Sequence, residues 1–72
     1  MTRGSGARTS VATHEVMFVQ EAMRVLGLYD GPIDGIAGAR TMRAVGRYKR
    51  RHGMTVDKTL DAELVAHVRQ ST

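Results

Sequence analysis

Three segments of the chain carry apolar residues at helical spacing, and glycine-rich or polar stretches separate them. In residues 14–26, apolar side chains recur at about 100° per residue on one arc, which is typical of an amphipathic helix. The arc consists of Val16, Val19, Met23 and Leu26, widened by Phe18, Ala22 and Val25. The pattern predicts a helix over residues 14–26, with Thr13 as its N-cap and Gly27 just beyond its end.

The second segment predicts a helix from Ala39 to His52 that has two distinct faces. The face that is expected to pack in the core carries Thr41, Ala44, Val45, Tyr48 and His52. The opposite face carries Arg40, Arg43, Arg47, Arg50 and Arg51. Gly46 lies inside this helix, where glycine costs about 1 kcal/mol relative to alanine, and we expect a close helix–helix contact to explain it.

The third segment repeats apolar residues every four positions, at Leu60, Leu64 and Val68. Asp61 is suited to cap the N-terminus of a helix here. Since no segment has the length and alternation of a strand, the sequence predicts a small all-α three-helix bundle over residues 13–70. Residues 1–12 are small, polar and basic, and they are predicted to form a disordered tail.

The loop between the first two helices concentrates turn-forming residues. Residues 27–41 contain four of the eight glycines, the only proline and two Asp-Gly pairs. Pro32 disfavours helical geometry in the residue before it, and Asp34-Gly35 is a tight-turn dipeptide. Ile33 and Ile36 are predicted to point into the core. We interpret this glycine- and proline-rich loop as a structural corner.

Ligand loops of known chemistry fit this stretch poorly. A calcium-binding EF-hand that started at Asp30 would have Pro32 at its third position and Thr41 at its twelfth, where oxygen ligands and a glutamate are needed. A phosphate-binding P-loop ends in Gly-Lys-Ser or Gly-Lys-Thr, which the run from Gly38 to Arg40 does not supply.

The composition narrows the chemistry further. The chain has no cysteine, and His14, His52 and His67 are scattered along the sequence, so we predict neither a metal site nor a cofactor. No nucleophile–base pair is evident, and three short helices leave little room for a cleft, so we predict that the protein is not an enzyme. No run of about 18 apolar residues is present, so we predict no transmembrane segment.

The net charge of +4 is unevenly distributed, because no acidic residue lies between Asp34 and Asp57. The arginine face of the second helix is therefore either a solvated surface or a contact surface for phosphates or another anionic polymer. Met17 and Phe18 make the apolar arc of the first helix wider than two neighbouring helices need. They either close the edge of the core or form an apolar patch for a partner or a second copy.

Short runs along residues 15–68 follow a recognisable order and spacing. They are Val19-Gln20, Leu26-Gly27-Leu28-Tyr29, Gly31, Ile33-Asp34-Gly35, Gly38, Thr41, Ala44-Val45, Tyr48, Gly53-Met54, Val56-Asp57 and Leu60-Asp61. In these runs the chain resembles the peptidoglycan-binding domain family, a three-helix module commonly attached to bacterial and phage cell-wall hydrolases.

The resemblance implies that the Asp-Gly loop is the structural turn of the family and that Thr41 caps or packs the second helix. It also implies a shallow wall-binding surface on the loop and the adjoining helices. The residues that match this surface are Tyr29, Asp30, Asp34 and Arg40. The chain departs from the family pattern where Ala37 replaces an aromatic residue, Lys49 a glutamine and Lys58 a glycine.

Three hypotheses of function follow. The first, which we favour, is a non-catalytic module that binds peptidoglycan in the cell wall, the periplasm or a phage particle. The second is a stand-alone structural or adaptor protein, located in the cytoplasm, that uses the same scaffold to bind proteins in a larger assembly. The third is a salt-dependent binder of nucleic acid or another polyanion through the arginine face.

Overall fold

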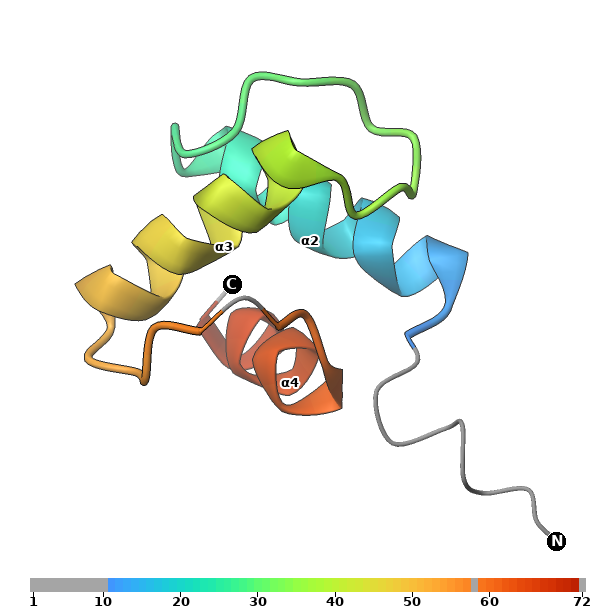
Figure 1. Cartoon of the computed structure of the whole chain (residues 1–72). Helices are drawn as coiled ribbons and strands as arrows, with labels where there is room; N and C mark the ends of the chain where they lie inside the picture. Colours follow the sequence, from blue (N-terminus) through green and yellow to red (C-terminus); the bar gives the residue numbers. More distant parts are fainter. Residues whose placement is uncertain (1–10, 58, 72) are drawn as a thin grey trace, which may run out of the picture.

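Three helices pack around one core (Figure 1). The computed structural model describes residues 11–57 and 59–71, and the helices within these ranges are α2 (Thr13–Val25), α3 (Ala39–Arg51) and α4 (Ala62–Ser71). α2 lies against both α3 and α4, and neither described range contains a strand. The predicted all-α fold is confirmed. Most of the predicted tail falls on residues 1–10, which lie outside the described ranges.

The N-terminus of α2 differs from the prediction by one residue. The cap residue is Ala12 rather than Thr13, and the N–H of Ala12 donates a hydrogen bond of 2.9 Å to Oε1 of Glu15. The prediction of Thr13 is wrong because Glu15 folds back over the first turn, so the cap position needs no polar side chain of its own. Asp61 does cap α4, since its Oδ1 accepts a 3.0 Å hydrogen bond from the N–H of Leu64.

α2 and α3 end in the same way, with a glycine in the left-handed conformation directly after the cap residue. Gly27 has φ 79° and Gly53 has φ 70°. At the end of α2, the N–H of Leu28 donates to the carbonyl of Met23 at 2.8 Å, and the equivalent bond closes α3. This Schellman arrangement satisfies carbonyls that the helix leaves open, and it turns the chain sharply at both ends.

Side chains from all three helices fill the core. The most deeply buried apolar ones are Val19, Met23, Val45, Tyr48, Leu64 and Val68. The prediction that His52 packs in the core is wrong. His52 caps the end of α3 and is exposed there, and its ring centroid lies 4.2 Å from that of Tyr48. The hydroxyl of Tyr48 lies 2.7 Å from Nδ1 of His67 and 2.8 Å from Oγ of Ser71, so it joins α3 to α4.

The side chain of Gln20 on α2 holds the loop of residues 26–38, which runs back along α2 (Figure 1). Gln20 is fully buried, and its oxygen accepts hydrogen bonds from the N–H groups of Asp34 and Gly35 at 3.1 and 3.0 Å. Its nitrogen donates to the carbonyl of Ile36 and to Oγ1 of Thr41, both at 3.0 Å. One amide side chain therefore satisfies polar groups of the loop and of the first turn of α3.

A second buried polar residue, Lys49 on α3, fixes the connection between α3 and α4. Lys49 forms an ion pair with Asp57 and donates a 2.8 Å hydrogen bond to the carbonyl of Thr59. Hydrogen bonds from Lys49 and then Thr59 lower the pKa of the Asp57 carboxyl, with the larger effect from Lys49. Lys49, which departs from the family pattern, therefore stabilises the connection between α3 and α4. The other departure in this segment, Lys58, lies outside the described residues.

Replacing Gln20 with leucine should lower the free energy of unfolding by about 3 kcal/mol, because the N–H groups of Asp34 and Gly35 lose their partner. Gln70→Leu is the matched control, since it changes an exposed glutamine of α4. Chemical denaturation of both variants measures the difference. Equal stability of the two variants would show that Gln20 does not hold the loop.

Acid should destabilise the fold through Asp34 and Asp57, because both folded-state pKa values lie below the ordinary value of 3.8. A carboxyl with a lowered folded pKa stabilises the protein above its unfolded pKa, and this contribution is lost as the pH falls through the folded pKa. We expect the melting temperature to drop as the pH is lowered from about 5, and to drop less in Asp57→Asn. A constant melting temperature over this range would contradict the prediction.

Candidate ligand-binding surface

Five arginines form a ridge along the outer side of α3. They are Arg40, Arg43, Arg47, Arg50 and Arg51, and all five are exposed. We call them the arginine ridge. Their spacing of mostly three or four residues keeps them on the side of α3 that faces away from the core. None of them forms an ion pair with a residue in 11–57 or 59–71, so their positive charge faces solvent.

A polar cleft lies between the arginine ridge and the loop that follows α2. It has a volume of about 400 Å³, and its polar lining includes Tyr29, Asp30, Arg40, Arg43 and Arg47. Asp30 forms no hydrogen bond with any residue of the described ranges, so its carboxylate can accept one from a ligand. Two elements of the fold therefore bring both signs of charge to one hollow.

A shallower depression of about 210 Å³ adjoins the polar cleft. Tyr29 and Arg40 line both hollows, whereas Asp34 and Ile36 line only the depression. The structure thus places all four residues that the family resemblance nominates, including Asp30 in the cleft, around two neighbouring hollows on one face.

Tyr29 shapes this surface from below and does not expose its ring. The residue is only 6% exposed, and its hydroxyl donates a 2.6 Å hydrogen bond to the carbonyl of Pro32. The packing is so close that a methyl group on Gly31 would come within 2.8 Å of Cζ of Tyr29 and of Cδ of Arg40. A ligand in either hollow can therefore reach only the edge of Tyr29.

Asp34 is held in the turn by its own hydrogen bonds. Its Oδ1 accepts from the N–H of Ile36 at 3.0 Å and from the side-chain nitrogen of Gln20 at 3.1 Å. These bonds lower the pKa of the Asp34 carboxyl, and the N–H of Ile36 has the largest effect. Asp34 therefore supports the loop, and Asp30 carries the carboxylate that remains available in the cleft.

The prediction that both isoleucines of the loop point into the core is wrong for Ile36. Ile33 packs partly buried against the core as predicted, but Ile36 is 66% exposed at the rim of the depression. Its carbonyl accepts the hydrogen bond from Gln20, which turns the backbone inward and leaves the side chain outside.

The apolar pair Met17 and Phe18 lines neither the polar cleft nor the depression. Phe18 is half-buried against the core, and the guanidinium carbon of Arg69 lies 5.4 Å from the centre of its ring. Met17 is 38% exposed. Phe18 thus closes the edge of the core, and a role of the pair in binding a partner, as the adaptor hypothesis requires, stays a prediction.

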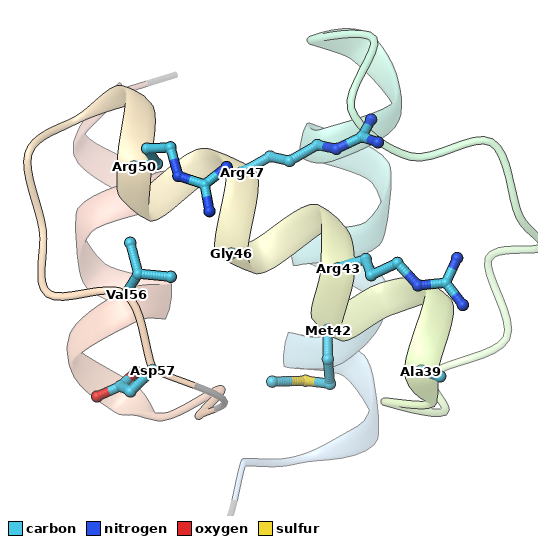
Figure 2. A pocket seen from close by; sticks show the side chains of 8 residues that line it. All are labelled: Ala39, Met42, Arg43, Gly46, Arg47, Arg50, Val56 and Asp57. Atoms are coloured by element: carbon cyan, nitrogen blue, oxygen red, sulfur yellow. The ribbon is translucent and has the colours of Figure 1, made fainter.

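An apolar groove of about 570 Å³ lies between α3 and the residues that follow it (Figure 2). Met42 and Val56 flank it, with Gly46 on the α3 wall between them. The expectation that three short helices leave little concavity is therefore wrong. Gly46 also does not make the expected close helix–helix contact, since within the described ranges a Cβ there would meet only Cγ1 of Val56, at 4.0 Å.

No aromatic ring lies open on this surface. The chain has one phenylalanine, two tyrosines and no tryptophan. Tyr29 and Tyr48 are buried, and Phe18 is half-buried. Aromatic rings offer the large flat apolar faces on which sugar rings stack, so the surface lacks a platform of that kind.

A protein-family model described as "Putative peptidoglycan binding domain" matches residues 13–68. The chain belongs to the peptidoglycan-binding domain family. No curated protein and no solved structure gave a match in the corresponding searches. The family match covers the whole of the arginine ridge and all three hollows, so the surface is part of the peptidoglycan-binding domain itself, which is a non-catalytic binding module.

In residues 11–57 and 59–71, no three side chains of the types that bind metals come together as a metal site. The helices of the same ranges are too short and too polar to cross a membrane.

Tyr29→Phe removes the hydroxyl that donates to Pro32 but keeps the ring. We expect the free energy of unfolding to fall by about 1 kcal/mol, because the Pro32 carbonyl loses its partner, while binding to purified sacculi stays unchanged. Urea denaturation and co-sedimentation with sacculi measure the two effects. A variant that kept its stability but lost binding would assign the hydroxyl to the ligand instead.

Proposed function

We propose that this domain binds peptidoglycan through the polar cleft. The observation that carries the proposal is that the loop and α3 bring Asp30 beside three arginines, at positions 40, 43 and 47, around one hollow. Both signs of charge are thus available to a single ligand. Two packed elements of the fold hold the backbone that carries these groups, so only the side chains need to be ordered when the ligand arrives.

Peptidoglycan offers groups that match this arrangement. Its glycan strands carry hydroxyl and acetamido groups, and its peptide stems carry carboxylates and amines. A guanidinium binds a carboxylate through two parallel hydrogen bonds, and the Asp30 carboxylate accepts hydrogen bonds from an amine or a hydroxyl. The buried side chains of Gln20 and Tyr29 support the loop under these contacts.

We also propose that the domain catalyses no reaction. Among the described residues, Asp30 lines the cleft and Asp34 lines the adjoining depression, and Asp34 is occupied by hydrogen bonds from Ile36 and Gln20. Hydrolysis between sugars commonly needs two carboxylates that flank the same bond. This arrangement supports binding without cleavage.

Co-sedimentation with purified sacculi tests the proposed cleft. We expect the wild-type chain to pellet with sacculi at low salt, and Arg40→Gln and Asp30→Asn to bind about fivefold more weakly, because each loses a charge-assisted hydrogen bond. Arg51→Gln is the matched control, since it removes the same charge from the same helix but lines none of the three hollows. Wild-type protein that stayed wholly in the supernatant would overturn the proposal.

The exposed charge of the arginine ridge favours a second candidate function, the binding of nucleic acid or another polyanion. Such binding depends on total charge, so it should weaken steeply with added salt and respond equally to Arg40→Gln and Arg51→Gln. Titration with duplex DNA at two salt concentrations measures both effects. Equal losses in the two variants would support this candidate, and a loss confined to Arg40→Gln would support the cleft.

A further inference from the structure

The apolar groove and the polar cleft share the arginine ridge. Arg43 and Arg47 line both hollows, Arg50 lines only the groove, and Arg40 lines the cleft but not the groove. The contacts proposed for the cleft use the two shared arginines but leave Arg50 and the apolar lining of the groove unused. Because one arginine is specific to each hollow, the two can be tested separately.

The groove stays open because of Gly46. Met42 and Val56 flank it (Figure 2). Val56 is 47% exposed although it is apolar. Glycine costs a helix about 1 kcal/mol relative to alanine, and within the described ranges no packing contact requires Gly46, since a Cβ there would meet Val56 only at 4.0 Å. A larger side chain at this position would fill the space between Met42 and Val56.

The charge around the groove is positive. Arg43, Arg47 and Arg50 border it, and among the described residues that line it Asp57 alone is acidic. The ion pair with buried Lys49 compensates the charge of Asp57. A ligand that fits the groove therefore needs small apolar groups at its centre and negative groups toward the arginines.

We infer that the apolar groove binds the peptide stem of peptidoglycan, a short peptide with free carboxylates and small apolar side chains. The inference rests on the proposed function and names the part of the polymer that this face recognises. Arg47 and Arg50 bind the carboxylates, and the floor between Met42 and Val56 takes up methyl side chains of the stem.

Two other kinds of ligand fit the groove less well. A glycan strand would lack a stacking platform, because no tyrosine or phenylalanine of the described residues lines the groove, and Tyr29 and Tyr48 are buried while Phe18 is half-buried. A partner helix would need a long apolar stripe, whereas the volume of about 570 Å³ is that of a small-ligand site.

Titration of the nitrogen-15-labelled chain with the synthetic pentapeptide L-Ala-γ-D-Glu-L-Lys-D-Ala-D-Ala tests the inference. The amide resonances of Gly46 and Val56 should move with the pentapeptide and stay in place with a tetramer of N-acetylglucosamine, which has no carboxylate. The pentapeptide with both carboxylates amidated should bind about tenfold more weakly, because the arginines lose their ionic partners.

Two variants change the groove without touching the residues specific to the cleft. Arg50→Gln removes a positive group from its border, and Gly46→Leu fills its floor with a residue that favours helix. Each should weaken pentapeptide binding about tenfold, whereas the matched controls Arg51→Gln and Ala66→Leu, at exposed positions outside the groove, should bind as the wild type does. If Gly46→Leu impairs folding, Arg50→Gln still tests the inference, because it changes an exposed side chain.

The outcomes separate this inference from the proposed function. Wild-type affinity for the pentapeptide in both groove variants would overturn the inference, and loss of sacculus binding in Arg40→Gln would still support the cleft. A wild-type chain that bound neither sacculi nor pentapeptide would overturn both. Resonances of Gly46 that moved with protein concentration alone would assign the groove to a second copy of the chain and overturn the inference as well.

Discussion

The buried amide of Gln20 is the interaction on which the rest of the structure depends. A chain of 72 residues has room for only a small core, and the loop between α2 and α3 has no regular structure to satisfy its backbone groups. Gln20 accepts from two loop N–H groups and donates to Ile36 and Thr41. It thereby closes the loop onto α2 and sets the point at which α3 begins.

The position of α3 gives the arginine ridge a hollow on either side. The loop forms the far wall of the polar cleft, and the connection to α4, with Val56, forms the far wall of the apolar groove. One buried polar side chain fixes each wall, Gln20 the loop and Lys49 the connection. The binding surface is therefore built from two irregular segments whose geometry depends on two hydrogen-bonded side chains in the interior.

Local patterns were sufficient to predict the helices, most of their buried residues and the glycine ends of α2 and α3. They were wrong at the helix ends, where Val25 and Leu26 are 85% and 40% exposed and His52 is exposed as well. The features that sequence reasoning missed depend on residues far apart in the chain. Gln20 is polar, so a pattern of hydrophobic residues does not identify it, although it lies on the buried arc of α2. The outward direction of Ile36 follows from the hydrogen bond of its carbonyl to Gln20. The groove beside Gly46 forms only in the folded chain, where Val56 of the segment after α3 lines the groove together with Gly46.

The pairing of Lys49 with Asp57 leaves no unpaired carboxylate among the described residues on the groove side of the arginine ridge. Asp57 lines the apolar groove, and it is the first acidic residue after Asp34 in the sequence. A carboxylate at this place without a partner of its own would attract the arginines and weaken their field. Lys49 engages Oδ1 of Asp57 from the buried side of α3 and lowers the pKa of that carboxyl. One lysine in the interior thus compensates the acidic residue closest to the groove and leaves the arginines on the outside for a ligand.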